Sequence, residues 1–402
     1  MKKNGFTLIE LLAVIAVLAI ILLIAVPNIL AIVNSAKDSI YVKNEQLLKQ
    51  SAINYYAVNF MATPSQIGEV NIVRYNTLIS GSYISDIKDP KNASTTCDGY
   101  VLVTKTSNTD FNYTPYIKCG TNYQTTNYEV STALTSVEVL AIAGGGSGGS
   151  HKDVGTATGA GGGGAGGLVF NASYAVTDAT PINVTIGAGG IRPQAEAGTN
   201  GSNTIFGTIT AIGGGGGGAR NSNPNNGGSG GGVGYVATTG GTGTAGQGFA
   251  GGNGGSIFGG AGGGGAGAAG TNATVDTGAA GGVGLYYGDR FGTSYGELGW
   301  FAAGGGGGSR TASALPGSLG GNGGAGDGGA SDQGGQDALT NTGSGGGGSS
   351  GGGYYGGNGA SGIVLIRYLG IPKATGGFIT SYNGYTIHAF LNGTSQFIPL
   401  SL

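Results

Sequence analysis

The most informative side chain in this sequence is a carboxylate set in an apolar segment. Glu10 is the only charged residue from position 6 to position 33. A carboxylate costs roughly 2.5 kcal/mol or more at the centre of a membrane-spanning helix, so it usually has a partner and a role. If the chain is cut after Gly5, Phe6 gains a free ammonium group. This ammonium would neutralise Glu10 of a neighbouring copy, so the spacing indicates an assembly contact.

The cysteines are a second candidate for chemistry. Cys97 and Cys119 are the only two in the 402 residues. In an exported protein, two cysteines most simply form one disulfide. A bridge that closes a loop of this size stabilises a fold by about 3 kcal/mol. Two free thiols, as in a reducing environment, are the alternative.

The histidines and the glycine motifs give no evidence of a metal site or a nucleotide-binding site. His151 and His388 are the only histidines and have no cluster of acids or cysteines near them, so we predict no metal site. His388 lies in a strand-like run, where we expect a half-exposed position. G-x-G-x-x-G matches arise by chance in so glycine-rich a chain, and no Gly-Lys-Ser or Gly-Lys-Thr follows them. We therefore predict no enzyme and no cofactor.

Composition argues against nucleic-acid binding and shows where the glycines are concentrated. The net charge is -2 and only 9% of the residues are charged, which gives no basic surface for nucleic acid. All but ten of the 93 glycines lie between positions 144 and 362. The length allows two or three domains.

A long helix must position Glu10. Residues 11–26 are uninterrupted apolar sequence and, with their flanks, reach the ~20 residues that span a bilayer. Lys2 and Lys3 place the leader, residues 1–5, in the cytoplasm, so the chain after the helix lies outside. We predict a helix over 6–61, with a transmembrane or filament-core part over 6–33. The face expected to pack under a globular head comprises Ile40, Leu47, Leu48, Ala52 and Tyr55.

Short strands follow the helix, and the expected fold class is α+β. A head over 62–130 contains a predicted hairpin, 100–104 with 113–118, and the cysteines lie just outside its strands. A glycine-rich domain over 136–370 and C-terminal strands over 371–402 complete the chain. The strands predicted there are 136–143, 168–170, 182–186, 204–212, 363–368 and those beside the Asn383-Gly384 and Asn392-Gly393 turns.

Three arrangements of the glycine-rich region compete. Collagen needs glycine at every third position and abundant proline, whereas these glycines are contiguous and the chain has 10 prolines, so collagen is excluded. A disordered linker is a common outcome of such composition but has little use for aromatic residues. The third arrangement, which we favour, is a packed array of polyproline-II-like strands whose backbones satisfy one another. The aromatic residues are Phe206, Phe249, Phe258, Tyr286, Tyr287, Phe291, Trp300, Phe301, Tyr354 and Tyr355.

Residues 5–12, GFTLIELL, resemble the processing site of type IV prepilins and pseudopilins. In that family a prepilin peptidase cuts after the glycine and methylates the new amino terminus. The resemblance therefore implies cleavage between Gly5 and Phe6 and N-methylation of Phe6. It also implies assembly roles for Glu10 and for Pro27, which softens the helix. A secretory signal or a simple membrane anchor is the alternative, but residues 26–28 make a poor signal-peptidase site.

Two further resemblances concern the rest of the chain. Glycine-rich domains of phage tail-fibre adhesins and of bacterial surface proteins are similar to residues 137–149, 182–190, 204–218 and 359–368. This similarity implies a β scaffold that carries a lattice of polyglycine-II helices, with recognition loops at one end. The heads of Gram-positive type IV pilins are similar, more weakly, to residues 88–90 and 97–100.

These features predict a type IV pilin-like structural subunit of a surface filament that displays a glycine-rich adhesion domain. The expected partners are a prepilin peptidase, other pilin subunits, the membrane before assembly, and a surface glycan or host receptor. One alternative is a pseudopilin of a type II secretion or DNA-uptake machine, although so bulky a domain suits a minor or tip subunit better. Another is a membrane-anchored surface adhesin that never polymerises. The aromatic residues would serve as lattice wedges or as stacking surfaces for sugars.

Overall fold

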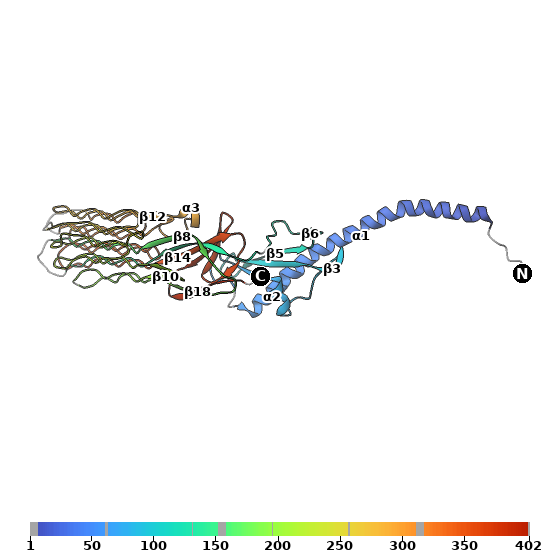
Figure 1. Cartoon of the computed structure of the whole chain (residues 1–402), viewed down its shortest axis with the longest axis horizontal. Coiled ribbons are helices and arrows are strands. Elements are labelled where there is room, and N and C mark those ends of the chain that lie inside the picture. Colours follow the sequence, from blue (N-terminus) through green and yellow to red (C-terminus); the bar gives the residue numbers. More distant parts are fainter. Residues whose placement is uncertain are drawn as a thin grey trace. The chain divides into compact units, whose positions relative to one another are not determined.

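The chain forms two compact units, Met1–Val130 and Ser131–Leu402, each with its own core (Figure 1). The computed structural model describes residues 7–60, 63–130, 132–151, 158–194, 196–255, 258–310 and 317–400. One long helix is followed by several antiparallel sheets. The α+β fold class is therefore confirmed.

The first unit packs one helix against a small sheet. The helix α1, Leu8–Val58, runs without a break through Pro27. The main sheet has the strand order β1-β4-β5-β6 and is antiparallel. The other bounds are β1 Val70–Arg74, α2 Tyr75–Ser80, β2 Lys88–Asp89, β3 Asn92–Thr96, β4 Asp98–Lys105, β5 Phe111–Cys119 and β6 Tyr123–Gln124.

The structure confirms part of the buried face predicted for α1, since Leu48 and Ala52 are fully buried, but Ile40 and Leu47 lie outside it. Ile40 and Leu47 are 40% and 49% exposed, whereas Tyr41 and Leu48 are fully buried. The Tyr41 hydroxyl donates to Asp89 at 2.6 Å, and its ring stacks on Tyr123 with centroids 4.3 Å apart. A buried aromatic ring contributes a large contact area when its hydroxyl has a partner, so the helix buries Tyr41 and leaves Ile40 exposed; the prediction for Ile40 and Leu47 is wrong.

A disulfide joins Cys97 to Cys119, with their Cα atoms 4.2 Å apart. Cys97 precedes β4 and Cys119 ends β5, and the first paired residues of the two strands are Asp98 and Lys118. The disulfide therefore joins the two positions that lie directly beyond the end pair of β4 and β5, Asp98 and Lys118. Both sulfurs lie in the core beneath α1.

Two five-stranded antiparallel sheets face each other in the second unit. Their strand orders are β16-β17-β14-β7-β8 and β11-β10-β9-β18-β15. Val139 and Ile366 of the first sheet share a core with Phe206 and Phe397 of the second. The bounds are β7 Ser136–Ile142, β8 Leu168–Ala175, β9 Ile182–Thr185, β10 Thr204–Phe206, β11 Ile209–Ala211, β14 Ile363–Leu369, β15 Ala374–Thr375, β16 Phe378–Tyr382, β17 Tyr385–Phe390 and β18 Thr394–Pro399.

The strands β7 and β14 are buried on both faces, which accounts for their nearly continuous apolar sequences. Leu140 and Leu365 turn away from the shared core and pack with Phe291 and Phe301. These aromatic residues come from a short segment that contains β12 Leu285–Tyr286, α3 Gly288–Phe291 and β13 Trp300–Phe301. The strands over 371–402 complete both sheets.

The single strand predicted over 204–212 is wrong, because this segment forms the hairpin β10–β11. Phe206 pairs with Ile209 across a two-residue turn. Gly207 occupies the turn with a φ of 53°, in the left-handed region that glycine adopts without steric cost. An isolated glycine in an otherwise apolar run was the signal for this turn.

The glycine-rich segments continue from the ends of the strands and form a lattice of backbone hydrogen bonds (Figure 1). Residues 144–151, which follow β7, show its pattern. One neighbouring segment provides the carbonyl groups of Ser202, Thr199 and Glu196, which accept from the N–H groups of residues 144, 147 and 150. A second neighbour provides those of Ala360, Gly357 and Tyr354, which accept from residues 145, 148 and 151. A third provides those of Gly164 and Gly161, which accept from residues 146 and 149. Every third residue faces the same neighbour, as in a polyproline II helix with three residues per turn.

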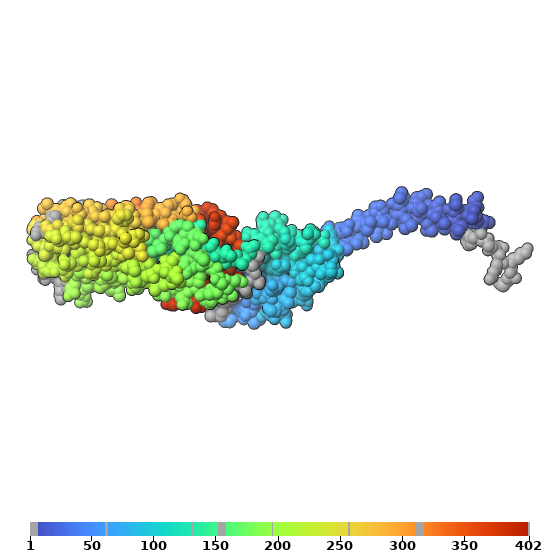
Figure 2. All heavy atoms as spheres, in the orientation of Figure 1, coloured from blue at the N-terminus to red at the C-terminus, as the bar shows by residue number. Residues whose placement is uncertain are grey.

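The same segment also accepts hydrogen bonds from three further segments. Its carbonyl groups bond to Gly190, to Gly214 and Gly217, and to Gly346 and Ser349. Six neighbouring segments around one central segment make a hexagonal packing. This is the packed array of polyproline-II-like strands that the sequence favoured. In the space-filling view the outer segments around residues 210–255, coloured green to yellow, pack against one another on the face shown (Figure 2).

In the central glycine runs of the lattice, glycine is required by space and not by backbone conformation. No glycine in 144–149, 161–164 or 213–218 has a φ in the left-handed region. A Cβ added at Gly163 would lie 2.2 Å from the carbonyl oxygen of Gly146, and one at Gly161 would lie 2.0 Å from that of Gly232. Real Cβ atoms essentially never come within 3.0 Å of another heavy atom. The close approach of the chains therefore excludes every side chain at these positions.

At the rim of the lattice, side-chain oxygens accept hydrogen bonds from backbone N–H groups that have no neighbouring carbonyl group to bond to. Most belong to asparagine or aspartate residues of the adjacent segment. Such acceptors satisfy backbone groups that would otherwise be left without a partner. The donor and acceptor pairs are Gly216 with Asn200, Thr242 with Asn226, Gly240 with Asn253, Asn253 with Asn272, Gly320 with Asp327, Asn358 with Asp337, and Arg192 with Asn358.

Candidate assembly and display sites

The carboxylate of Glu10 caps its own helix. Thr7 is the N-cap of α1, and its N–H and hydroxyl groups each donate to Oε2 of Glu10 at 2.9 Å. The N–H of Glu10 donates in return to Oγ1 of Thr7 at 3.4 Å. This is a capping box, which satisfies donors at a helix start. Both bonds to the carboxylate end on Oε2, so Oε1 carries neither of them.

The cleavage pair Gly5 and Phe6 lies outside the described residues. Thr7 is the first described residue, and α1 begins directly after it at Leu8. A chain cut after Gly5 would therefore carry its ammonium two residues before the start of α1. The first helical turn has negative carboxylate charge, which suits the positive end of the helix dipole.

The first half of α1 presents apolar side chains that nothing in the first unit covers. Leu8, Leu12 and Leu23 are 85%, 67% and 79% exposed. Within the described part of the chain, α1 is the one helix long and apolar enough to cross a membrane, and its most apolar window is not buried at all. Such a surface suits lipid or other copies of the same helix.

Pro27 lies inside α1 and lacks the N–H that would bond to the carbonyl of Leu23. The side chain of Asn28 donates to the carbonyl of Ile24 at 3.1 Å. The helix therefore has weaker internal bonding around Pro27 than elsewhere while keeping its helical path. Glu10 and Pro27 share this helix, whereas Cys97 and Cys119 belong to the sheet of the same unit.

The lattice ends in loops away from the sheets of the second unit (Figure 1). Within the lattice, Tyr235 and Phe258 stack with ring centroids 5.4 Å apart. The guanidinium of Arg310 lies 4.2 Å from the centroid of Phe258 and pairs with Asp276 at 3.0 Å. This stack joins residues of three lattice segments.

The aromatic residues of the glycine-rich region divide into two groups. Phe206, Phe291 and Phe301 are at most 1% exposed and pack in the sheet cores. Tyr354 and Tyr355 are 37% and 46% exposed. Because Tyr354 accepts a bond from His151, at the end of the segment that starts from β7, these two tyrosines belong to the loop end of the lattice.

The two parts of the chain match two known families. Residues 1–26 match the prokaryotic N-terminal methylation motif, and residues 120–369 match the family described as a glycine-rich domain. The chain belongs to this glycine-rich domain family. No curated protein matches the chain significantly. The methylation motif implies processing by a prepilin peptidase and a location in the membrane or a pilus, and it is typical of pilin-like proteins, which are generally structural.

His388, on β17 of the second unit, is fully buried, so the expected half-exposed position is wrong. Its Nδ1 lies 2.7 Å from the carbonyl oxygen of Gly376 and its Nε2 lies 2.8 Å from the hydroxyl of Tyr368. Since a carbonyl only accepts, Nδ1 carries the proton and Nε2 accepts from the tyrosine. Burial lowers the pKa of His388 from 6.5 to about 4, and the bond to Gly376 opposes this only in part.

This burial predicts an acid-sensitive step in stability. Because the folded pKa lies below the unfolded one, the stabilisation is complete above pH 6.5 and is lost as the pH falls toward about 4. The difference amounts to about 3 kcal/mol. Denaturant unfolding of the full chain at several pH values would measure it. His388→Gln, which cannot titrate, should flatten the dependence over that interval, and an unchanged slope in this variant would contradict the prediction.

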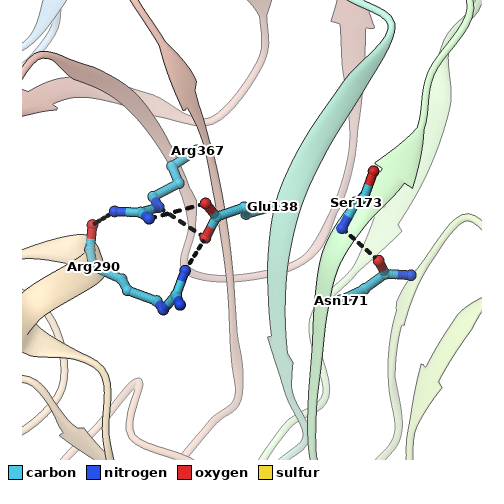
Figure 3. A network of polar contacts seen from close by, with 5 residues as sticks. All are labelled: Glu138, Asn171, Ser173, Arg290 and Arg367. Atoms are coloured by element: carbon cyan, nitrogen blue, oxygen red, sulfur yellow. Dashed lines mark hydrogen bonds and ion pairs between the residues drawn. The ribbon is translucent and has the colours of Figure 1, made fainter.

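A charged network crosses the first sheet of the glycine-rich domain (Figure 3). Arg367 on β14 donates two hydrogen bonds of 2.9 Å to the carboxylate of Glu138 on β7. It also donates to the carbonyl of Arg290 at 2.8 Å. The side chain of Arg290 also pairs with Glu138 at 2.8 Å. Burial alone would raise the pKa of the Glu138 carboxyl, but its bonds to Arg367 and Arg290 outweigh burial and hold the pKa below its usual value. The network ties the β scaffold to α3.

The structure also places His151 and several residues that sequence reasoning missed. His151 is buried, with Nε2 2.7 Å from the hydroxyl of Thr158. No group of three or more metal-binding side chains occurs among the described residues. The Thr7 cap was readable, because Thr-x-x-Glu before an apolar run signals a capping box. The Glu138–Arg367 pair had no such signal, since its residues are far apart in sequence.

Proposed function

We propose that this chain is a type IV pilin-like structural subunit that is cut after Gly5, N-methylated on Phe6 and polymerised through α1 into a surface filament. The observation that carries the proposal is the exposed apolar half of α1 with Glu10 at its start. An apolar helix surface of this length suits a bundle of like helices. The new ammonium on Phe6 supplies the charge that a carboxylate in apolar surroundings needs.

The assembly step is tested by Glu10→Ala. We expect filaments to fall at least about tenfold while the amount of subunit in the membrane stays unchanged, because losing one buried charge pair removes more than 1.4 kcal/mol per contact. Asp38→Ala is the matched control, since Asp38 is an exposed carboxylate of the same helix, paired with Lys91. Immunoblots of sheared filaments measure both. Normal filaments with Glu10→Ala would instead favour an anchored adhesin that never polymerises.

A pseudopilin of a secretion or DNA-uptake machine shares the same amino terminus and is the second candidate. The size of the glycine-rich domain favours a minor or tip subunit of a pilus over a repeated element of a short pseudopilus. Long surface filaments that contain this chain would support the pilus. A requirement for the chain in secretion or DNA uptake, without such filaments, would support the pseudopilus.

The glycine-rich domain would serve in adhesion through the loop end of its lattice. Tyr354 and Tyr355 are the exposed aromatic pair there, and a stacked aromatic contributes about 1 kcal/mol. Their double replacement by alanine is expected to reduce attachment of filament-bearing cells to glycan-coated surfaces by about tenfold. Tyr286→Ala is the control, because Tyr286 is 40% exposed but lies in β12. Equal attachment by both variants would exclude these tyrosines as the adhesive surface.

A further inference from the structure

Asparagine followed by glycine is the sequence most prone to spontaneous deamidation. The backbone nitrogen of the glycine attacks Cγ of the asparagine side chain, and glycine presents no Cβ to hinder that approach. The reaction therefore needs a free asparagine side chain and a glycine nitrogen that can turn toward it. Seven Asn-Gly steps lie in the described residues, and the structure treats them differently.

Four steps lie in the lattice, and each holds both reacting groups away from each other. At Asn200, Oδ1 accepts from Gly216 at 3.0 Å, while the N–H of Gly201 donates to Gly214 at 2.9 Å. At Asn358, Oδ1 accepts from Arg192 at 2.9 Å, while the N–H of Gly359 donates to Gly190 at 2.9 Å.

The other two lattice steps repeat this arrangement. Asn226 accepts from Thr242 at 2.7 Å, and Gly227 donates to the carbonyl of the same residue at 3.2 Å. Asn253 accepts from Gly240 at 2.9 Å, and Gly254 donates to Thr238 at 3.1 Å. Attack at any of the four sites would have to break a bond at the glycine nitrogen and a bond at the asparagine side chain.

The step at Asn392 and Gly393 has neither restraint. Both residues are exposed in the turn before β18, and the side chain of Asn392 bonds to none of the described residues. The carbonyl of Gly393 accepts from Ile186 at 2.9 Å, whereas the N–H of Gly393 donates to none of the described residues. Nothing lies within 4 Å of a Cβ added at Gly393, so the approach to its nitrogen is open.

The two remaining steps differ from each other. At Asn322 the following Gly323 donates its N–H to Oε2 of Glu297 at 2.7 Å, so this step has one of the two restraints. At Asn383 neither the side chain nor the N–H of Gly384 bonds to any described residue. Asn383 differs from Asn392 in its backbone, which has a φ of 49° in the two-residue turn between the paired residues Tyr382 and Tyr385.

We propose that Asn392 is a site of spontaneous covalent modification, and that the lattice protects its own asparagines from the same reaction. The Gly393 nitrogen forms a bond to Cγ of Asn392, and the side-chain nitrogen leaves as ammonia with the amide proton. Water then opens the resulting succinimide at either carbonyl, giving aspartate or isoaspartate. No oxidant or cofactor is needed. Each event adds one negative charge before β18, and isoaspartate also lengthens the backbone there.

The test is peptide mapping by mass spectrometry on the full chain in membranes or detergent, aged at mildly alkaline pH. We expect aspartate and isoaspartate to accumulate at Asn392 at least about tenfold faster than at Asn200, Asn226, Asn253 or Asn358. In denaturant the five rates should converge, because the lattice bonds are then lost. Gly393→Ala should slow the reaction at Asn392 about tenfold and leave the other sites unchanged.

Two results would overturn the proposal. One is modification of the lattice asparagines in the folded chain at the rate seen for Asn392. The other is a rate at Asn392 that stays the same in Gly393→Ala, which would mean direct hydrolysis of the side chain. The inference does not depend on filament assembly, because the rates are measured on the subunit itself.

Discussion

Gly163→Ala is expected to lower the free energy of unfolding of the glycine-rich domain by about 3 kcal/mol or more. The added Cβ would lie 2.2 Å from the carbonyl oxygen of Gly146, with further backbone atoms at 2.7 and 2.8 Å. Gly163 also donates to Gly346 and accepts from Gly305. Backbone on several sides cannot move aside as a flexible side chain can, so the surrounding hydrogen bonds must break.

The matched control is Gly246→Ala, because nothing lies within 4 Å of a Cβ at that position. Its φ of 76° lies in the left-handed region, so alanine should lower the free energy of unfolding there by only about 1 kcal/mol, through backbone conformation alone. Thermal unfolding of the full chain measures both variants. Amide hydrogen exchange would show faster exchange in segments 143–151 and 343–349 for Gly163→Ala only. Equal stability of the two variants would mean that the lattice is not close-packed at Gly163.

Arg367→Met is expected to destabilise the same domain by about 3 kcal/mol. The side chain of Arg367 is only 10% exposed, grips Glu138 with two bonds, and lies 4.2 Å from the ring centroid of Tyr385. Methionine keeps the apolar contact with the ring but leaves the carboxylate of Glu138 half-buried with one partner. Chemical denaturation at neutral pH measures the loss.

The neighbouring arginine provides the control for this network. Arg290 contacts the same carboxylate but its side chain is 45% exposed, so Arg290→Met should cost about 1 kcal/mol or less. Replacing Glu138 and Arg367 together by methionine should restore most of the stability lost in Arg367→Met, since no buried charge is then left alone. If the double variant is less stable than Arg367→Met, the pair stabilises the domain by more than mutual neutralisation.

Local sequence was sufficient for the helix and for most strands. The apolar run and the amphipathic pattern after it predicted a helix over 6–61, which the structure has as α1 at Leu8–Val58. Strands such as β4, β7 and β14 were readable because alternating or continuous apolar residues have a fixed relation to burial. The errors concern details that depend on distant partners. Tyr41 displaced Ile40 from the core because Asp89 and Tyr123 meet it there.

The sequence by itself determined that the amino terminus carries a processing motif and an acid in an apolar helix, and that the glycine clusters belong to a region bracketed by strands. Only the tertiary structure decided which glycine segments are neighbours. Contiguous glycines have no side-chain pattern that could encode a register, so the three-residue period is invisible in the sequence. Register is set instead by the strands from which the segments start, such as β7 and β14, and by the side chains of rim residues such as Asn200 and Asn358.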